Sequence, residues 1–108
     1  MKMITAIVNR KDINTVSECL NEAHFEFTKL ATTGGFLRAG NTTLLVGVDD
    51  DKLDEALSII RENSSRRVEK VPEMVPTPGG TLLTVYPAEV IVGGAIVFVT
   101  DVAYFEKM

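Results

Sequence analysis

The 108-residue sequence has little of what enzyme and metal sites are usually built from: one cysteine, one histidine and no tryptophan. The single cysteine, Cys19, excludes an internal disulfide and a metal site made of several thiolates. The single histidine, His24, follows it by five residues, so a helix would not bring the two side chains together as nucleophile and base. We therefore predict no catalytic residues, no metal and no cofactor, with Cys19 in the core and His24 at a helix C-terminus.

Long apolar runs and an excess of basic residues are also missing. No run reaches the roughly 18 apolar residues of a membrane-spanning helix, and the N-terminus leads into a strand pattern without the apolar segment of a signal peptide. The 15 acidic and 11 basic residues give a formal net charge of −4, which is not typical of a protein that coats nucleic acid. The sequence thus favours a cytoplasmic protein with no membrane and no nucleic-acid partner.

What is present fits a globular chain. Hydrophobic residues make up 45% and charged residues 24% of the sequence, close to the average for globular domains. Since a chain this short cannot enclose two separate cores, residues 1–108 are expected to form a single domain.

The first half of the chain alternates between the periodicities of strands and of a helix. Short β-branched runs and apolar residues at a period of two indicate strands, whereas apolar residues three and four apart indicate a helix. We expect a strand at 4–8, a helix at 13–23 that Asp12 or Asn14 could cap, and strands at 25–33 and 42–48. Because only about eight residues separate the last two strands, they are predicted to pair antiparallel.

A second helix is expected after residue 50. Apolar residues recur at helical spacing over residues 53–60. The aspartates at 49–51 suit its N-terminus, where they complement the helix dipole and cap backbone amides. The helix is predicted to end near residues 63–65.

The remaining sequence predicts a long loop and a hairpin. Residues 68–71 are typical of a short strand, and residues 72–80 hold three of the four prolines, so we expect one long loop without regular structure there. Strands at 85–92 and 95–102 are predicted to form a hairpin through Gly93-Gly94. A short tail, 104–108, would follow.

In order, these elements give the βαββαβ pattern of the ferredoxin-like α+β fold, with an antiparallel sheet, an extra hairpin arm and one long loop. Both helices would cover one face of the sheet. Residues 44–46 and 96–99 are apolar at consecutive positions, so both faces of their strands are apolar. We therefore expect an oligomer that covers the second face.

The segment 32–42 has the composition of a ligand-binding loop. Its Gly34-Gly35 pair lets the backbone approach a ligand, Arg38 supplies a cation, and Asn41 carries a donor and an acceptor suited to a base edge. The pattern alone fits equally well a glycine-rich hairpin whose Phe36 packs on a neighbouring subunit. The segment matches neither a P-loop nor a Rossmann fingerprint, so it does not predict a nucleoside triphosphatase.

A family resemblance extends over nearly the whole chain and is carried most specifically by Met1–Ile4, by the sixteen residues Thr28–Thr43 and by Val90–Val99. These segments resemble the PstA-type, PII-like cyclic di-AMP receptors of Gram-positive bacteria. The resemblance implies a trimeric ferredoxin-like protein without catalysis. It also implies one cyclic di-AMP in each cleft between subunits. The ligand would order a short loop near 36–41 and a long one near 72–84, and an unknown protein partner would bind according to the state of these loops.

Carried over position by position, the resemblance implies seven ligand-binding residues: Thr28, Gly35, Phe36, Leu37, Asn41, Gly47 and Phe98. The phenylalanines would offer apolar surface to adenine, the Thr28 and Asn41 side chains would offer hydrogen bonds, and the backbone at 35–37 would approach the ring or a phosphate. Four further candidates near the ligand are His24, Glu26, Arg38 and Lys107.

Three positions depart from the family pattern. His24 and Glu26 stand where well-characterised members have an asparagine and an arginine, and Lys107 replaces a glutamine. If Glu26 points into the cleft, it repels the two phosphates, at a cost of about 1 kcal/mol or more; Lys107 or a protonated His24 would offset this in part. Three functions stay open: a cyclic di-AMP receptor, a PII-like trimer for another nucleotide or none, and a small enzyme or metal-binding protein on the same fold.

Overall fold

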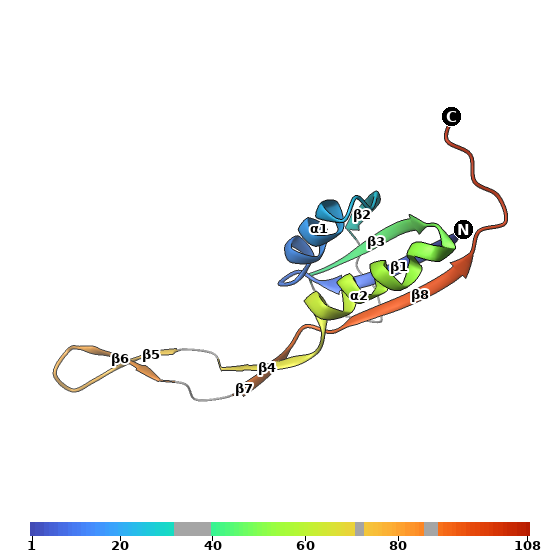
Figure 1. Ribbon diagram of the computed structural model, residues 1–108. Coiled ribbons are helices and arrows are strands. Elements are labelled where there is room, and N and C mark those ends of the chain that lie inside the picture. The colour runs from blue at the N-terminus through green and yellow to red at the C-terminus, as the bar shows by residue number, and fades with distance from the viewer. Residues whose placement is uncertain (32–39, 71–72, 86–88) are drawn as a thin grey trace.

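The computed structural model describes residues 1–31, 40–70, 73–85 and 89–108. Its body is a four-stranded antiparallel sheet in the order β2 (Phe27–Ala31), β3 (Asn41–Val48), β1 (Lys2–Asn9) and β8 (Ala95–Asp101). The helices α1 (Ile13–Glu22) and α2 (Leu53–Ser64) cover one face of this sheet (Figure 1). A short 3-10 helix, η1 (Asp50–Lys52), leads into α2. This strand order and layering confirm the predicted ferredoxin-like α+β fold.

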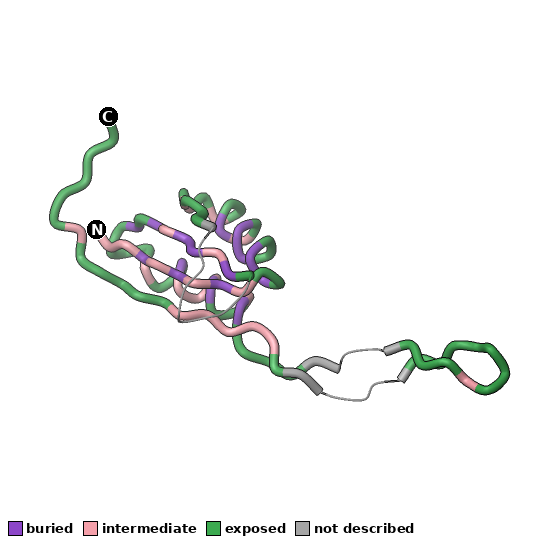
Figure 2. Tube along the Cα trace, turned by 180° about the vertical axis from the view of Figure 1, so that it is seen from behind, coloured by how far each residue is buried: buried purple, intermediate pink, exposed green. Residues whose placement is uncertain are grey.

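The core lies between the sheet and the helices because apolar residues alternate along the central strands (Figure 2). From Ile4 to Val8 every second residue of β1 is fully buried, and β3 places Leu44, Val46 and Val48 on the same side. The buried set from the strands and from both helices is Ile4, Ala6, Val8, Leu44, Val46, Val48, Ile13, Val16, Leu20, Ala56 and Ile60. Cys19, expected in the core, is only partly buried.

The opposite face of the sheet, which we call the open face, carries no helix (Figure 1). Cross-strand partners in an antiparallel sheet point to the same side, so the register assigns to it residues 3, 5 and 7 of β1 and their partners in β3 and β8. In β8, Val97, Phe98 and Val99 are 38%, 45% and 40% exposed. Both faces of this strand are thus apolar and partly open, as predicted, and we still expect a second copy to cover the open face.

An arm projects from the body between α2 and β8 (Figure 1). It consists of two short antiparallel ladders, β4 (Arg67–Lys70) with β7 (Glu89–Val92) and β5 (Glu73–Pro76) with β6 (Leu82–Val85). The prediction of an irregular loop over 72–80 was therefore wrong for β5. Both strands of a two-stranded ribbon are edge strands, so Pro76 at the end of β5 costs no central ladder hydrogen bond.

The predicted hairpin through Gly93-Gly94 was also wrong. The two flanking strands do not pair with each other: β7 pairs with β4, and β8 pairs with β1. Both glycines have positive φ angles, of 78° and 89°, and the Gly94 N–H donates to the carbonyl of Ser64 at 2.6 Å. The glycines thus redirect the chain from the arm into the sheet.

Side-chain capping does not occur where the sequence predicted it. Asp12 stands at the N-cap position of α1 without a capping hydrogen bond, and the N-cap residue of α2 is Lys52. Asp49 likewise makes no capping bond to η1, and Asp50 forms an ion pair with the amino group of Met1 at 3.0 Å. The carboxylates of Asp12 and Asp50 are thus paired with cations, Arg67 and the Met1 amino group, instead of with helix amides.

The ends of several elements agree with their predictions and others differ by a few residues. α2 ends at Ser64, and residues 104–108 have no regular structure, as expected. β2 begins at Phe27 instead of residue 25, because the Phe25 N–H is bound to the carbonyl of Leu20 at the end of α1. In the described ranges, no helix is both long and apolar enough to cross a membrane.

Candidate functional site

A cavity of about 590 Å³ lies on the open face, where β2 begins and β3 ends; we call it the sheet-end cavity. The pairing register builds its floor, because Thr28 lies across from Leu45 and Gly47 lies across from Met3. Phe105, from the tail after β8, contributes an aromatic wall. Two of the predicted ligand residues, Thr28 and Gly47, therefore line one cavity with a largely apolar surface and a single hydroxyl.

Gly47 keeps this cavity open. A Cβ atom added at this position would meet the Cε atom of Met1 at 3.5 Å, an ordinary contact with the end of a flexible side chain. The strand would therefore accept a larger residue, which would occupy the space next to Thr28. The fold does not require glycine at position 47, and the missing side chain leaves space in the cavity.

A second cavity of about 430 Å³, the helix-exit cavity, adjoins the first. It shares Glu26 and Gly47 with the sheet-end cavity and adds His24, Asp49 and Lys52. His24 is exposed just beyond the end of α1, with a φ angle of 65°, and its N–H donates to the carbonyl of Asn21 at 3.0 Å. The structure therefore brings two of the three departures from the family pattern, His24 and Glu26, to the edge of the candidate site.

Glu26 and Lys107 lie close together. The Lys107 Nζ atom is 3.9 Å from Glu26 Oε2, and the two side chains are 79% and 90% exposed. Solvent screens such a pair, which is worth between 0 and about 1 kcal/mol. The Lys107 cation beside Glu26 would nevertheless reduce the repulsion that this carboxylate exerts on a nearby phosphate.

Phe98 and Asn41 lie away from both cavities in the same chain. Thr28, Leu45, Thr5 and Phe98 form one row across the open face, from the β2 edge to the β8 edge. Three strand spacings of about 4.8 Å separate the ends of this row by roughly 14 Å. Asn41, only 9% exposed, begins β3, and six residues of strand place it roughly 20 Å from Gly47. The predicted contacts therefore divide into two groups.

Four predicted residues, Gly35, Phe36, Leu37 and Arg38, lie outside the described residues. Sequence reasoning missed Met1, Met3, Val102 and Phe105, which line the sheet-end cavity. The period of two in β1 could have assigned Met3 to the open face, because its neighbour Ile4 belongs to the buried set. No periodicity marks Phe105, which lies in a tail without regular structure.

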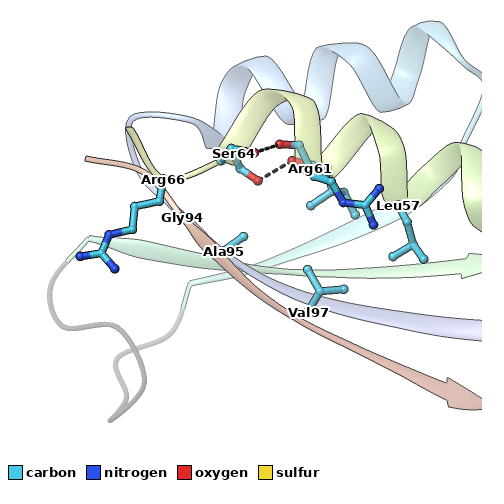
Figure 3. A pocket seen from close by; sticks show the side chains of 9 residues that line it. Leu57, Arg61, Ser64, Arg66, Gly94, Ala95 and Val97 are labelled. Carbon is cyan, nitrogen blue, oxygen red and sulfur yellow. Dashed lines mark hydrogen bonds between the residues drawn. The ribbon is translucent and has the colours of Figure 1, made fainter. Parts of the chain in front are cut away.

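A groove of about 440 Å³ lies between the end of α2 and the start of β8 (Figure 3). Its floor is apolar, and Arg61 and Arg66 flank it. Figure 3 shows their guanidinium groups pointing in different directions, so they do not converge on one anion. The hydroxyl groups of Ser64 and Ser65 donate to helix carbonyls and are not directed into the groove. Within the described part of the chain, no group of acidic, histidine or cysteine side chains could hold a metal ion.

The fold defines a class: antiparallel, ferredoxin-like α+β proteins. Comparison with known proteins supports this class. A protein-family model described as "Cyclic-di-AMP receptor" matches residues 1–108. The chain belongs to this cyclic di-AMP receptor family, and it is a PII-like signalling protein.

Two further proteins are similar to this chain. The chain is 33% identical over 78 residues to the "Nitrogen fixation nifHD region GlnB-like protein 1" of Methanothermococcus thermolithotrophicus, a match that covers 60% of this chain and 74% of that protein. It also resembles the crystal structure of a functionally unknown protein from Pediococcus pentosaceus ATCC 25745, with a TM-score of 0.77 and 40% identity over 99% of this chain and 96% of that one.

Proposed function

We propose that the chain is a non-enzymatic receptor that forms a homotrimer, binds cyclic di-AMP in the clefts between subunits, and changes its loop conformation to signal a protein partner. The family match over residues 1–108 supports the ligand class. The observation that supports a site between subunits is the position of Thr28 and Phe98. They stand at the two ends of one row across the open face, on opposite edge strands of the sheet. The cytoplasmic location stays a prediction.

The division of the predicted contacts into two groups explains why a second copy is needed. Thr28 and Gly47 line the sheet-end cavity beside β2, whereas Phe98 lies on the opposite edge strand and Asn41 lies at the opposite end of β3. A ligand that touched all four in one chain would have to lie across the whole open face. In a closed ring of copies, the β8 edge of one subunit can face the β2 edge of the next. Each cleft then receives Thr28 and Gly47 from one subunit and Phe98 from the next.

The chemistry of these groups suits a nucleotide with two adenines. Phe98, 45% exposed, offers a ring surface for stacking, and the Thr28 hydroxyl in the sheet-end cavity offers a hydrogen bond. The ligand would bind more tightly to the conformation in which the loops are ordered. That difference in affinity would shift the loop population toward the ordered state and produce the signal.

Calorimetric titration of the purified protein with cyclic di-AMP tests this function, with cyclic di-GMP and ATP as controls. We expect saturable binding near one cyclic di-AMP per subunit, tighter than about 10 µM, which corresponds to roughly −7 kcal/mol. A protein confirmed as a trimer that shows no heat with cyclic di-AMP would contradict the proposal.

The second candidate function is a PII-like trimer that binds a different nucleotide or none. It is favoured by Glu26, whose exposed carboxylate lines both cavities at the place where the family has an arginine. Under this alternative the fold is kept while the charge at the cleft no longer suits a dianionic ligand.

Replacing Glu26 with arginine is expected to strengthen cyclic di-AMP binding about three- to tenfold, roughly 0.7–1.4 kcal/mol, because repulsion becomes attraction at an exposed position. The gain should shrink as salt is added, since screening weakens exposed charges. Glu22→Arg, which makes the same charge change on the exposed side of α1, is the matched control. Equal affinities for the two variants would show that Glu26 does not face the phosphates.

A further inference from the structure

An ion pair between a buried carboxylate and a half-exposed guanidinium lies at the base of the arm. The Asp12 carboxylate is 5% exposed and accepts two hydrogen bonds from the Arg67 guanidinium, at 2.8 Å and 3.2 Å. Arg67 also donates to the carbonyl of Ser65 at 3.4 Å. Because Arg67 is the first residue of β4 and Asp12 precedes α1, this two-point contact joins the arm to the body. Bidentate pairs of this kind fix orientation as well as distance.

The returning strand of the arm is held at the same place. A Cβ atom on Gly93 would lie 2.6 Å from Arg67 Nη1, 2.9 Å from the Ser65 carbonyl oxygen and 3.0 Å from Asp12 Oδ2, so only glycine fits against the ion pair. The next residue, Gly94, donates its N–H to the Ser64 carbonyl, and Figure 3 shows these two residues side by side. Both strands of the arm are therefore tied to the body within a few residues of each other.

The turn that carries Asp12 follows the end of β1, which pairs with the strand end that carries Asn41. Asn41 is paired with Asn9 at the last position of the β1–β3 ladder. The Asp12 N–H donates to the Asn9 carbonyl at 2.9 Å, and the Arg10 N–H donates to the Gly40 carbonyl at 2.8 Å. One short turn, residues 9–12, thus contacts the residue before Asn41 and supplies the carboxylate that holds the arm.

We propose that the Asp12–Arg67 pair is a latch that holds the arm in one direction and transmits ordering at the ligand site to the arm. The proposal rests on the proposed function. It adds the contact through which a change in order at the ligand site reaches the arm. Among the described residues, Arg67 is the cation paired with the Asp12 carboxylate. A buried carboxylate that loses its cation is strongly destabilised, so a shift of the 9–12 turn displaces Arg67 instead of opening the pair. The arm presents Val68 and Ile91 on its surface, 58% and 59% exposed, where a protein partner can read its position.

Hydrogen exchange of the intact protein tests the latch. In Asp12→Ala without ligand, the amides of β4 and β7 should exchange at least tenfold faster than in the unmodified protein, while those of β1 and β3 stay unchanged. Lys2→Ala is the matched control, because it removes an exposed ion pair with Asp101 at another edge of the sheet. Gly93→Ala should have the same effect as Asp12→Ala and replaces it if Asp12→Ala does not fold. Unchanged exchange at β4 and β7 in a folded variant would overturn the latch.

The same measurement with cyclic di-AMP tests transmission. The ligand should slow exchange at β4 and β7 in the unmodified protein, and this slowing should be lost in Asp12→Ala although its affinity stays within about threefold. Equal slowing in both proteins would overturn transmission through the pair. If the unmodified protein does not bind cyclic di-AMP, both the proposed function and transmission of the ligand's effect to the arm are contradicted. Hydrogen exchange measured without ligand still tests whether the Asp12–Arg67 pair holds the arm.

Discussion

Replacing Ile7 with glutamate is expected to convert the proposed trimer into monomers and to abolish the proposed cyclic di-AMP binding while the chain stays folded. Ile7 lies on the open face in the central strand β1, opposite Thr43 on one side and Ile96 on the other. It does not line either cavity of the candidate site. In a monomer the new carboxylate faces water. In a trimer it is buried without a partner, which costs several kcal/mol per subunit.

Mass from light scattering, circular dichroism and calorimetry together check this prediction. Thr15→Glu places the same charge on the exposed side of α1, and we expect that variant to stay trimeric and to bind normally. An Ile7→Glu protein that remained a trimer would show that the open face is not the subunit interface. A folded monomer that still bound cyclic di-AMP would show that one subunit suffices for the site.

Replacing Asn41 with alanine is expected to weaken cyclic di-AMP binding more than tenfold, or about 1.4 kcal/mol. The family resemblance places this side chain against the ligand, and an amide that donates and accepts is suited to an adenine edge. The loss of one such hydrogen bond with its partner left buried is typically worth 1–3 kcal/mol. Calorimetry on the two proteins measures the change directly.

The matched control for Asn41→Ala is Thr42→Ala, the next residue of β3, whose side chain points to the opposite face of the sheet. Because Asn41 is only 9% exposed, thermal unfolding of both variants should be recorded as well. A variant that binds as tightly as the unmodified protein would remove Asn41 from the site.

The body of the fold could be predicted from the sequence because its core follows simple periodicities. Ile4, Ala6 and Val8 alternate in β1, and Val16 and Leu20 recur at helical spacing in α1. Such patterns depend on burial against one neighbouring layer and are visible in the chain itself. The fold class was predicted correctly, but the fourth strand of the sheet is β8, whereas the strand expected at 68–71 belongs to the arm as β4.

The arm and the helix caps could not be predicted because they depend on contacts between distant residues. Gly93-Gly94 has the composition of a hairpin turn, yet β8 finds its partner in β1, about ninety residues earlier in the chain. Asp12 has the position of a capping residue, yet its carboxylate is bound by Arg67. In both cases a long-range partner overrides the local preference.

The candidate site was predicted in part. The family resemblance named Thr28 and Gly47, which the structure places in one cavity, and it raised Lys107 as a cation that could offset Glu26, which lies 3.9 Å away. Periodicity alone would not have named any of these residues as ligands. The apolar wall from Phe105 depends on the path of the tail after β8, which no pattern in the sequence describes.

A mixed-trimer titration tests most directly whether the site lies between subunits. Gly47→Leu should fill the sheet-end cavity beside Thr28, and Phe98→Ala should remove the stacking surface on β8; each variant alone should be trimeric and fail to bind cyclic di-AMP. If the two groups come from neighbouring subunits, random equal mixing restores about a quarter of the clefts, because each cleft needs the intact side of both copies. Calorimetry should then show about 0.25 strong sites per subunit at the unmodified affinity. No strong sites in trimers shown to contain both variants would contradict a cleft shared between subunits.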